Sequence, residues 1–313
     1  MMLENLDQSK LNFSQDSLFF LNFSLAIIMF GVALDLKLSD FRQIGKYPKS
    51  FLVGIISQFL FLPFLTFCLV YALSLPPSVA LGMFLVAACP GGNISNFLTN
   101  LAKGNTALSV SLTAFSTGFS LFLTPLNFAF WAGLYGPTAG MLKSISLSYT
   151  EVFLTIILIL GIPLGLGIWA NSNFPDWSKK AREILRPLSI LIFAAFVIIA
   201  FIGNLDLFLA YIGYIFVWVL AHNLLALFAG FSLAKLSELS LEDTKTITIE
   251  TGIQNSGLGL VLIFTYFNGL GGMAIIAAWW GIWHIISGMG IAMLWKPKTA
   301  NGKTSTLKFP TQL

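Results

Sequence analysis

The sequence predicts an all-α polytopic membrane protein, from its composition, its apolar runs and the placement of its basic residues. Of the 313 residues, 57% are hydrophobic and only 10% are charged, whereas a soluble domain is about 25% charged. The apolar runs are long enough to cross a bilayer as helices, which takes about 20 residues each. The net charge of +4 does not indicate nucleic acid as a partner, because the basic residues are sorted by membrane side.

Nine transmembrane helices are expected, and each follows one apolar run. They lie at about 17–36, 50–73, 78–101, 106–132, 148–170, 187–204, 208–232, 246–267 and 272–295. Only four residues, 203–206, separate the sixth run from the seventh. Pro63, Pro125 and Pro163 fall inside spans, where a membrane helix tolerates a kink if its neighbours satisfy the freed carbonyls.

The basic residues predict the orientation of the chain. Fifteen of the 17 fall on one side: Lys37, Arg42, Lys46, Lys49, Lys103, Lys179, Lys180, Arg182, Arg186, Lys235, Lys245, Lys296, Lys298, Lys303 and Lys308. Only Lys10 and Lys143 fall on the other side. The positive-inside rule therefore places the N-terminus outside and the tail 296–313 in the cytoplasm of a multi-pass cell-membrane protein, inner or plasma membrane. This orientation requires an odd number of spans, as nine is.

Two spans are interrupted by glycines and polar residues. The third contains the segment 90–96, Pro-Gly-Gly-Asn-Ile-Ser-Asn, and the eighth contains Glu250 within the segment 249–257. A charged side chain at membrane depth costs roughly 3 kcal/mol on insertion scales, and irregular backbone cannot face lipid. Interrupted helices in matching positions of two halves indicate the binding site of a secondary transporter. The sequence therefore predicts transport, with Glu250 at its centre.

A first constellation of oxygen-bearing side chains surrounds these breaks. It comprises Ser95, Asn96, Ser109, Thr113 and Glu250. Ser109 and Thr113 are four residues apart and share one helix face. Hydroxyl, amide and carboxylate oxygens suit a hard cation such as sodium. The alternative is structural, because serine and threonine often line helix–helix contacts in membranes.

A second constellation combines Gln58, Glu250 and Gln254 with carbonyls freed near Thr251 and Ile253. Gln58 lies in an apolar run and is not expected to face lipid; interhelical hydrogen bonding is its alternative role. Glu250 could instead carry a proton.

The remaining reactive side chains are weaker candidates. A lone histidine in a membrane helix is more often a packing residue than a ligand, and a functional role stays open for His284 and, less so, for His222. Cys68 and Cys89 are expected to be buried free thiols. The sequence contains no phosphate-binding loop, HExxH motif or nucleophile elbow, so no enzyme is expected.

These motifs resemble the bile acid:sodium symporter family over about 17–295. The matching segments are 31–34 with 39–41, 89–92 with Ser95 and Asn96, 104–109, 250–257, and Trp283 with His284. The resemblance implies two inverted repeats, a core domain, a panel domain, and two broken helices that cross near the midplane. The core would be about 50–132 and 208–295, and the panel about 17–36 and 148–204. The first helix of the ten-helix family fold is missing here, so the leading repeat should have four helices.

The resemblance also implies two sodium sites and an anion site. The first sodium site matches Ser95, Asn96, Ser109, Thr113 and Glu250; the second matches Gln58, Glu250, Gln254 and the carbonyls of Thr251 and Ile253. The substrate residues would be Asn93, Ile94, Asn255 and His284, between panel and core. One sodium ion offsets Glu250, and the positive charge of a second would be balanced by an organic monoanion.

The expected function is sodium-coupled symport of an organic anion, bile acid-like or a small carboxylate, by alternating access. The expected partners are that anion and the lipid bilayer, in a monomer or weak homo-oligomer. Four alternatives stay open at this point: a proton-coupled transporter that uses Glu250, a non-transporting membrane receptor, a channel, and an intramembrane enzyme. The enzyme alternative lacks a nucleophile–base pair or a metal set, and the channel alternative lacks a ring of repeated polar residues.

Overall fold

The computed structural model describes residues 4–9, 23–24, 26–31, 33–34, 43–144, 157, 161–202 and 204–296, and all regular secondary structure within these ranges is helical. The named elements are α1 (Glu4–Gln8), η1 (Gln43–Lys46), α4 (Pro48–Ile56), η2 (Ser57–Phe61), α5 (Leu62–Leu73), α6 (Pro77–Ala88), α7 (Ile94–Leu101), α8 (Thr106–Leu134), α9 (Gly136–Ser144), α11 (Ile162–Asn173), α12 (Pro175–Ile202), α13 (Leu205–Leu236), α14 (Leu241–Gly252), α15 (Ser256–Tyr266) and α16 (Gly271–Trp295).

Four helices of the described residues are long and apolar enough to cross a membrane. They are Pro48–Leu73, Thr106–Leu134, Phe208–Leu236 and Gly271–Trp295. Each agrees within a few residues with a predicted span. Their outer faces are apolar, as lipid-facing surfaces require: Leu60 is 59% exposed, Leu126 67% and Leu209 60%. The prediction of a polytopic all-α membrane protein is therefore supported by helix length and by the surface.

The two predicted interruptions are confirmed as helix breaks. The third span divides into α6 and α7, and the eighth divides into α14 and α15. α14 begins at Leu241, five residues before the predicted boundary, because its first turn is polar and the Ser240 hydroxyl caps it by accepting from the Asp243 N–H at 3.1 Å. Lys245, predicted in a loop, lies within this helix and is 8% exposed.

The first, fifth and sixth predicted spans are only partly described. Helical residues occur within 23–34, α11 covers the end of the fifth span, and α12 begins twelve residues before the predicted 187. The polar stretch after Pro175 extends α12, since proline suits a first helical turn. Residues 35–42, 145–156 and the tail 297–313 lie outside the described residues, so the count of nine stays a prediction.

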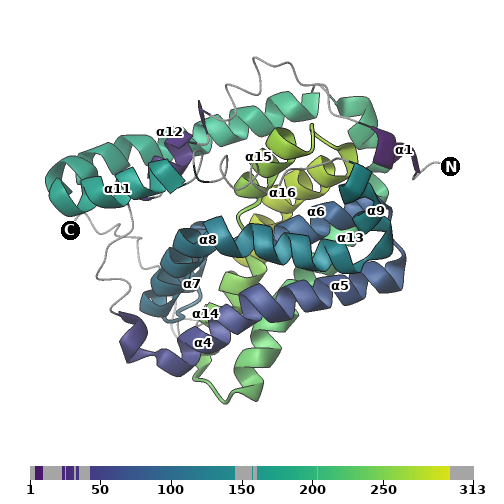
Figure 1. Cartoon of the computed structure of the whole chain (residues 1–313). Coiled ribbons are helices and arrows are strands. Elements are labelled where there is room, and N and C mark those ends of the chain that lie inside the picture. The colour runs from purple at the N-terminus through teal and green to yellow at the C-terminus, as the bar shows by residue number, and fades with distance from the viewer. Residues whose placement is uncertain are drawn as a thin grey trace, which may run out of the picture.

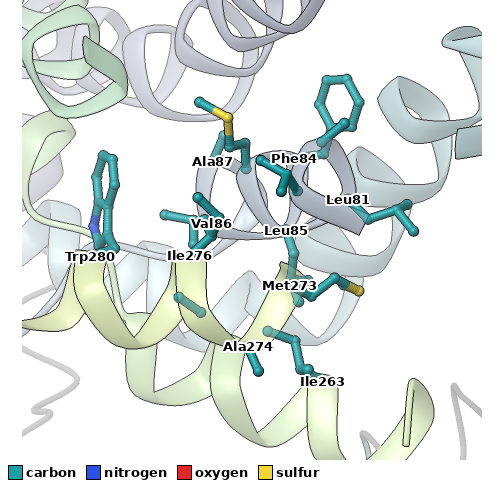
Figure 2. Close-up of a cluster of buried hydrophobic side chains, with 14 of the residues drawn as sticks. Leu81, Phe84, Leu85, Val86, Ala87, Ile263, Met273, Ala274, Ile276 and Trp280 are labelled. Atoms are coloured by element: carbon teal, nitrogen blue, oxygen red, sulfur yellow. The ribbon is translucent and has the colours of Figure 1, made fainter. Parts of the chain in front are cut away.

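The core of the molecule surrounds α6, which packs against α15 and α16 (Figure 1). Every residue of α6 from Ser78 to Ala88 is buried. Val86 and Leu85 of α6 lie beside Ile276 and Met273 of α16 (Figure 2). A Cβ at Gly82 would lie 2.9 Å from the Met273 Cα, so the two backbones approach closely, as small residues allow in membrane helices. α11 and α12 lie together at one side of the molecule (Figure 1).

The two cysteines differ from each other. Cys89 is a buried free thiol at the C-terminal end of α6, as expected. Cys68 is also free but exposed. The prediction that it is buried is wrong, because an apolar run in a membrane protein supplies lipid-facing as well as packed positions.

Candidate functional site

The two helix breaks cross and pair with each other. Gly91 and Gln254 form an antiparallel bridge. The Gly92 N–H donates to the Ile253 carbonyl at 2.8 Å, and the Asn255 N–H donates to the Pro90 carbonyl at 2.8 Å. A broken helix leaves backbone groups without intrahelical partners, and these must be satisfied inside the membrane. The two breaks therefore stabilise each other, and four half-helices end at one buried point.

Glu250 lies at this crossing, on the last turns of α14, and is 1% exposed. The Ser95 hydroxyl donates to its Oε1 at 2.5 Å, and the Thr113 hydroxyl lies 3.1 Å from both carboxylate oxygens. The Ser109 hydroxyl also donates to Oε1. These donors come from α7 and α8, so three helices meet at one carboxylate.

Asn96 completes this cluster. Its Oδ1 lies 2.8 Å from the Ser109 hydroxyl and 3.4 Å from the Thr113 hydroxyl. Every side chain of the first predicted constellation is thus brought together, and each contributes an oxygen. A set of hydroxyl, amide and carboxylate oxygens without nitrogen or sulfur donors suits a hard monovalent cation.

The second constellation gathers around Gly91, which lies against Glu250 and Gln58 and forms the bridge with Gln254. A Cβ at Gly91 would lie 2.8 Å from Glu250 Oε2 and 3.2 Å from Gln58 Nε2, so only glycine allows this approach. Gln58 is 1% exposed and Gln254 0%. Among the described residues, neither Oε1 atom has a hydrogen-bond partner. Two unpaired amide oxygens this deeply buried carry a desolvation cost, and a cation beside them would offset it.

A π-helical turn presents Gln58. The turn η2 covers Ser57–Phe61, and the Leu62 N–H bonds five residues back to the Ser57 carbonyl. Pro63 follows directly; its ring would clash with the carbonyl four residues before it in a regular helix. π turns are rare and are frequent at functional sites.

The freed carbonyls at the end of α14 each find one partner. The Gln254 amide donates through Nε2 to the Thr251 carbonyl at 2.8 Å, and the Ile253 carbonyl accepts from Gly92 as described. A carbonyl oxygen has two lone pairs, so both of these carbonyls keep one for a cation.

The predicted substrate residues fall around the same crossing. Asn93 is exposed and Ile94 half-buried where α7 begins, and Asn255 caps α15 by accepting from the Leu258 N–H at 3.1 Å. His284 lies on α16 and is 6% exposed. It is one turn before Gly288, whose Cβ position lies 2.6 Å from Ile253. Among the described residues, the His284 Nδ1 has no partner.

Three polar side chains make contacts that were not predicted from the sequence. The Asn223 amide donates to the Gly252 carbonyl at 2.9 Å. Lys245 donates to the carbonyls of Ala102 and Trp295 at 2.9 and 3.3 Å. The His222 Nε2 lies 2.8 Å from the Thr66 hydroxyl. The only signal in the sequence was the presence of these polar residues in apolar helices, which does not identify their partners.

Comparisons with known proteins point to one family. A model described as Sodium Bile acid symporter family matches residues 22–211. The uncharacterized sodium-dependent transporter YocS of Bacillus subtilis is 35% identical over 306 residues, which cover 95% of this chain and 92% of that protein. The probable chloroplastic sodium/metabolite cotransporter BASS2 of Oryza sativa subsp. japonica is 31% identical over 274 residues, 87% of this chain and 62% of its own length. A sodium-dependent organic anion transporter of Bos taurus is 27% identical over 278 residues, 82% of this chain and 71% of that protein.

Proposed function

This chain belongs to the sodium bile acid symporter family, and we propose that it uses a sodium gradient to carry an organic anion across the membrane. Its relatives include proteins named sodium-dependent transporters and a sodium-dependent organic anion transporter. These similarities support an organic anion as the substrate class.

The observation that carries the proposal is the oxygen cluster around Glu250. A buried carboxylate without a cationic partner costs several kcal/mol. Among the described residues, its side-chain hydrogen-bond partners are hydroxyl groups. A bound cation or a proton on the carboxylate would balance this charge, and five convergent oxygen-bearing side chains favour sodium. Ser95, Asn96, Ser109, Thr113 and Glu250 form the proposed first site.

The proposed second sodium site shares Glu250. Its other ligands are the amide oxygens of Gln58 and Gln254 and the carbonyls of Thr251 and Ile253. The unpaired, buried Oε1 atoms of the two glutamines support it. With two sodium ions and one carboxylate, the region carries one net positive charge, which an organic monoanion would neutralise.

The anion is proposed to bind beside the crossing, near Asn93, Ile94, Asn255 and His284. α7 and α15 both begin at the breaks, at Ile94 and Ser256. The N-terminal ends of helices carry partial positive charge, and half-helix N-termini of this kind face anionic groups in secondary transporters. The exposed Asn93 side chain and the half-buried Asn255 offer amide donors to a carboxylate or sulfonate.

Transport is proposed to follow alternating access between two inverted repeats. The core would comprise about 50–132 and 208–295, and the panel about 17–36 and 148–204. Sodium would stabilise the arrangement that forms the anion site, and this difference in affinity between states is the coupling. The N-terminus is proposed to lie outside and the C-terminus in the cytoplasm of the cell membrane.

Uptake into proteoliposomes tests the proposal. Labelled organic monoanions (bile acids, small keto and hydroxy acids, sulfonates) are offered under an inward sodium gradient, an inward proton gradient or neither. Uptake of at least one anion driven by sodium at equal pH on both sides is expected. Uptake driven by protons without sodium would overturn sodium coupling and assign Glu250 the role of proton carrier. Binding of an anion without uptake under any gradient would indicate a receptor.

A further inference from the structure

The end of α14 presents three successive carbonyls to three different partners. The Thr251 carbonyl accepts from Gln254, the Gly252 carbonyl from Asn223 and the Ile253 carbonyl from Gly92. Continuing the helix would have paired the Gly252 carbonyl with the Ser256 N–H, which instead bonds to the Gln254 carbonyl at 2.9 Å. The Gly252 carbonyl is therefore an orphan acceptor, and a side chain from α13 satisfies it.

The Asn223 amide is fixed in one orientation. Asn223 is 0% exposed. Its Nδ2 lies 2.9 Å from the Gly252 carbonyl, which can only accept, so the NH₂ group must face α14. Its Oδ1 accepts from the Ser287 hydroxyl of α16 at 2.5 Å. One amide thus connects α13, α14 and α16 at the last residue of α14, where the second break begins.

The peptide that Asn223 holds lies between the two carbonyls of the proposed second sodium site. The carbonyl of this Gly252–Ile253 peptide accepts from Asn223, and its N–H donates to the Ile249 carbonyl at 3.0 Å. Hydrogen bonds at both ends fix the plane of this peptide. They therefore restrict the backbone rotations that set the direction of the Thr251 carbonyl, one peptide earlier, and of the Ile253 carbonyl, one peptide later.

The surrounding packing keeps the Asn223 amide in register with α14. Leu227, one turn further along α13, packs directly on Gly252. Gly230 lies on the same face of α13, and a Cβ there would lie 2.7 Å from the Ile247 carbonyl. The two helices therefore touch backbone to backbone along several turns, and Asn223 lies where that contact reaches the break.

We propose that Asn223, supported by Ser287, is a positioning residue for the second sodium site. It contacts no ion itself; it aims the carbonyls of Thr251 and Ile253. This inference rests on the proposed sodium coupling. It predicts that removing the amide weakens the second site and leaves the first site, on α7 and α8, intact.

The test counts the sodium ions linked to folding in the purified full-length protein. Melting temperature is measured against NaCl concentration, with KCl holding ionic strength constant, for wild type and Asn223→Leu. A ligand that binds only the folded state stabilises it in proportion to the logarithm of its concentration above Kd. The slope per tenfold change in NaCl therefore reports the number of ions bound. A two-ion slope is expected for wild type and a one-ion slope for Asn223→Leu.

Thr66→Val is the matched control. It removes another buried hydrogen bond to α13, the one to His222, without touching Gly252. It should lower the melting temperature in KCl and keep the two-ion slope. A purely structural role for Asn223 would produce the same behaviour in Asn223→Leu, so a retained two-ion slope there overturns the inference.

The milder variant Ser287→Ala keeps the test decisive if Asn223→Leu does not fold. It removes the anchor of the Asn223 Oδ1, together with a bond to the His284 carbonyl at 3.2 Å within the same helix. The NaCl midpoint for the second ion should then rise roughly 3- to 10-fold. An unchanged midpoint would contradict the positioning role. A wild-type slope of one ion or none would remove the second site altogether and overturn the proposed sodium stoichiometry together with this inference.

Discussion

At the scale of single residues, the account depends on one carboxylate and one glycine. Glu250 is 1% exposed and surrounded by hydroxyl donors. Gly91 belongs to the other break and lies against it, with Gln58 on the same side. A single methyl group at position 91 would occupy the space in which both proposed sodium sites meet.

Gly91→Ala should therefore abolish sodium-specific stabilisation. The added Cβ would lie 2.8 Å from Glu250 Oε2, which displaces the carboxylate from the hydroxyls that hold it. The measurement is the difference in melting temperature between NaCl and KCl. Gly118→Ala is the control, because its Cβ would meet nothing within 4 Å and alanine is the better helix former by about 1 kcal/mol. A full sodium response in Gly91→Ala would show that Glu250 and Gln58 do not act together at this position.

At the scale of elements, the first half of α14 binds the neighbouring helix ends into one unit. The buried Lys245 ammonium donates to the last carbonyls around α7 and α16, at Ala102 and Trp295. Such orphan carbonyls carry partial negative charge, which a cation stabilises. Asp243 accepts from the Ser50 hydroxyl at 2.6 Å and from the Asn105 amide at 2.8 Å. α14 thus links α4, α7, α8 and α16.

Lys245→Met should destabilise the protein without removing sodium binding. Loss of hydrogen bonds from a charged donor to two buried carbonyls should lower the free energy of unfolding by about 2–3 kcal/mol. The check is the melting temperature in KCl, which should fall, while the additional rise in NaCl persists. Lys235→Met, at an exposed position in the last turn of α13, should change little. A loss of the sodium response in Lys245→Met alone would indicate that Lys245 acts on the site rather than on helix ends.

The sequence was sufficient to predict the breaks but not the contacts that hold them. Glycine and polar residues inside an apolar run are a local signal, so the segments around Gly91 and Glu250 could be recognised as interruptions. The cap by Lys245 and the bond from Asn223 to Gly252 depend on residues distant in the chain. Which side chain satisfies an orphan carbonyl is decided by packing, and no periodicity encodes it.

At the scale of the whole molecule, the apolar helices and the sorting of basic residues support a single membrane orientation. The helical hairpin turn containing Glu238 follows the basic end of α13, and the turn containing Ser74 joins α5 to α6. Both side chains are exposed. Because successive spans alternate in direction, the proposed topology assigns these two turns to opposite sides.

Cysteine labelling in intact cells tests this topology. In a background with Cys68→Ala and Cys89→Ala, a membrane-impermeant thiol reagent should label Ser74→Cys from outside. It should label Glu238→Cys only in inside-out vesicles, because the proposed orientation places that turn and its basic neighbours in the cytoplasm. The reverse pattern would invert the orientation, and labelling of both from one side would remove a span between them.

Direct binding of radiolabelled sodium tests the central claim, that Glu250 and its oxygen cluster hold this ion. Purified wild type is compared with Glu250→Gln, which keeps the shape but removes the charge. Ser111→Ala is the control: Ser111 lies on α8 two residues from Ser109, and its hydroxyl donates to the Ala107 carbonyl at 2.9 Å. Saturable binding is predicted for wild type and Ser111→Ala and should be lost in Glu250→Gln folded in KCl. Equal sodium binding by Glu250→Gln, or none by folded wild type, would contradict the account.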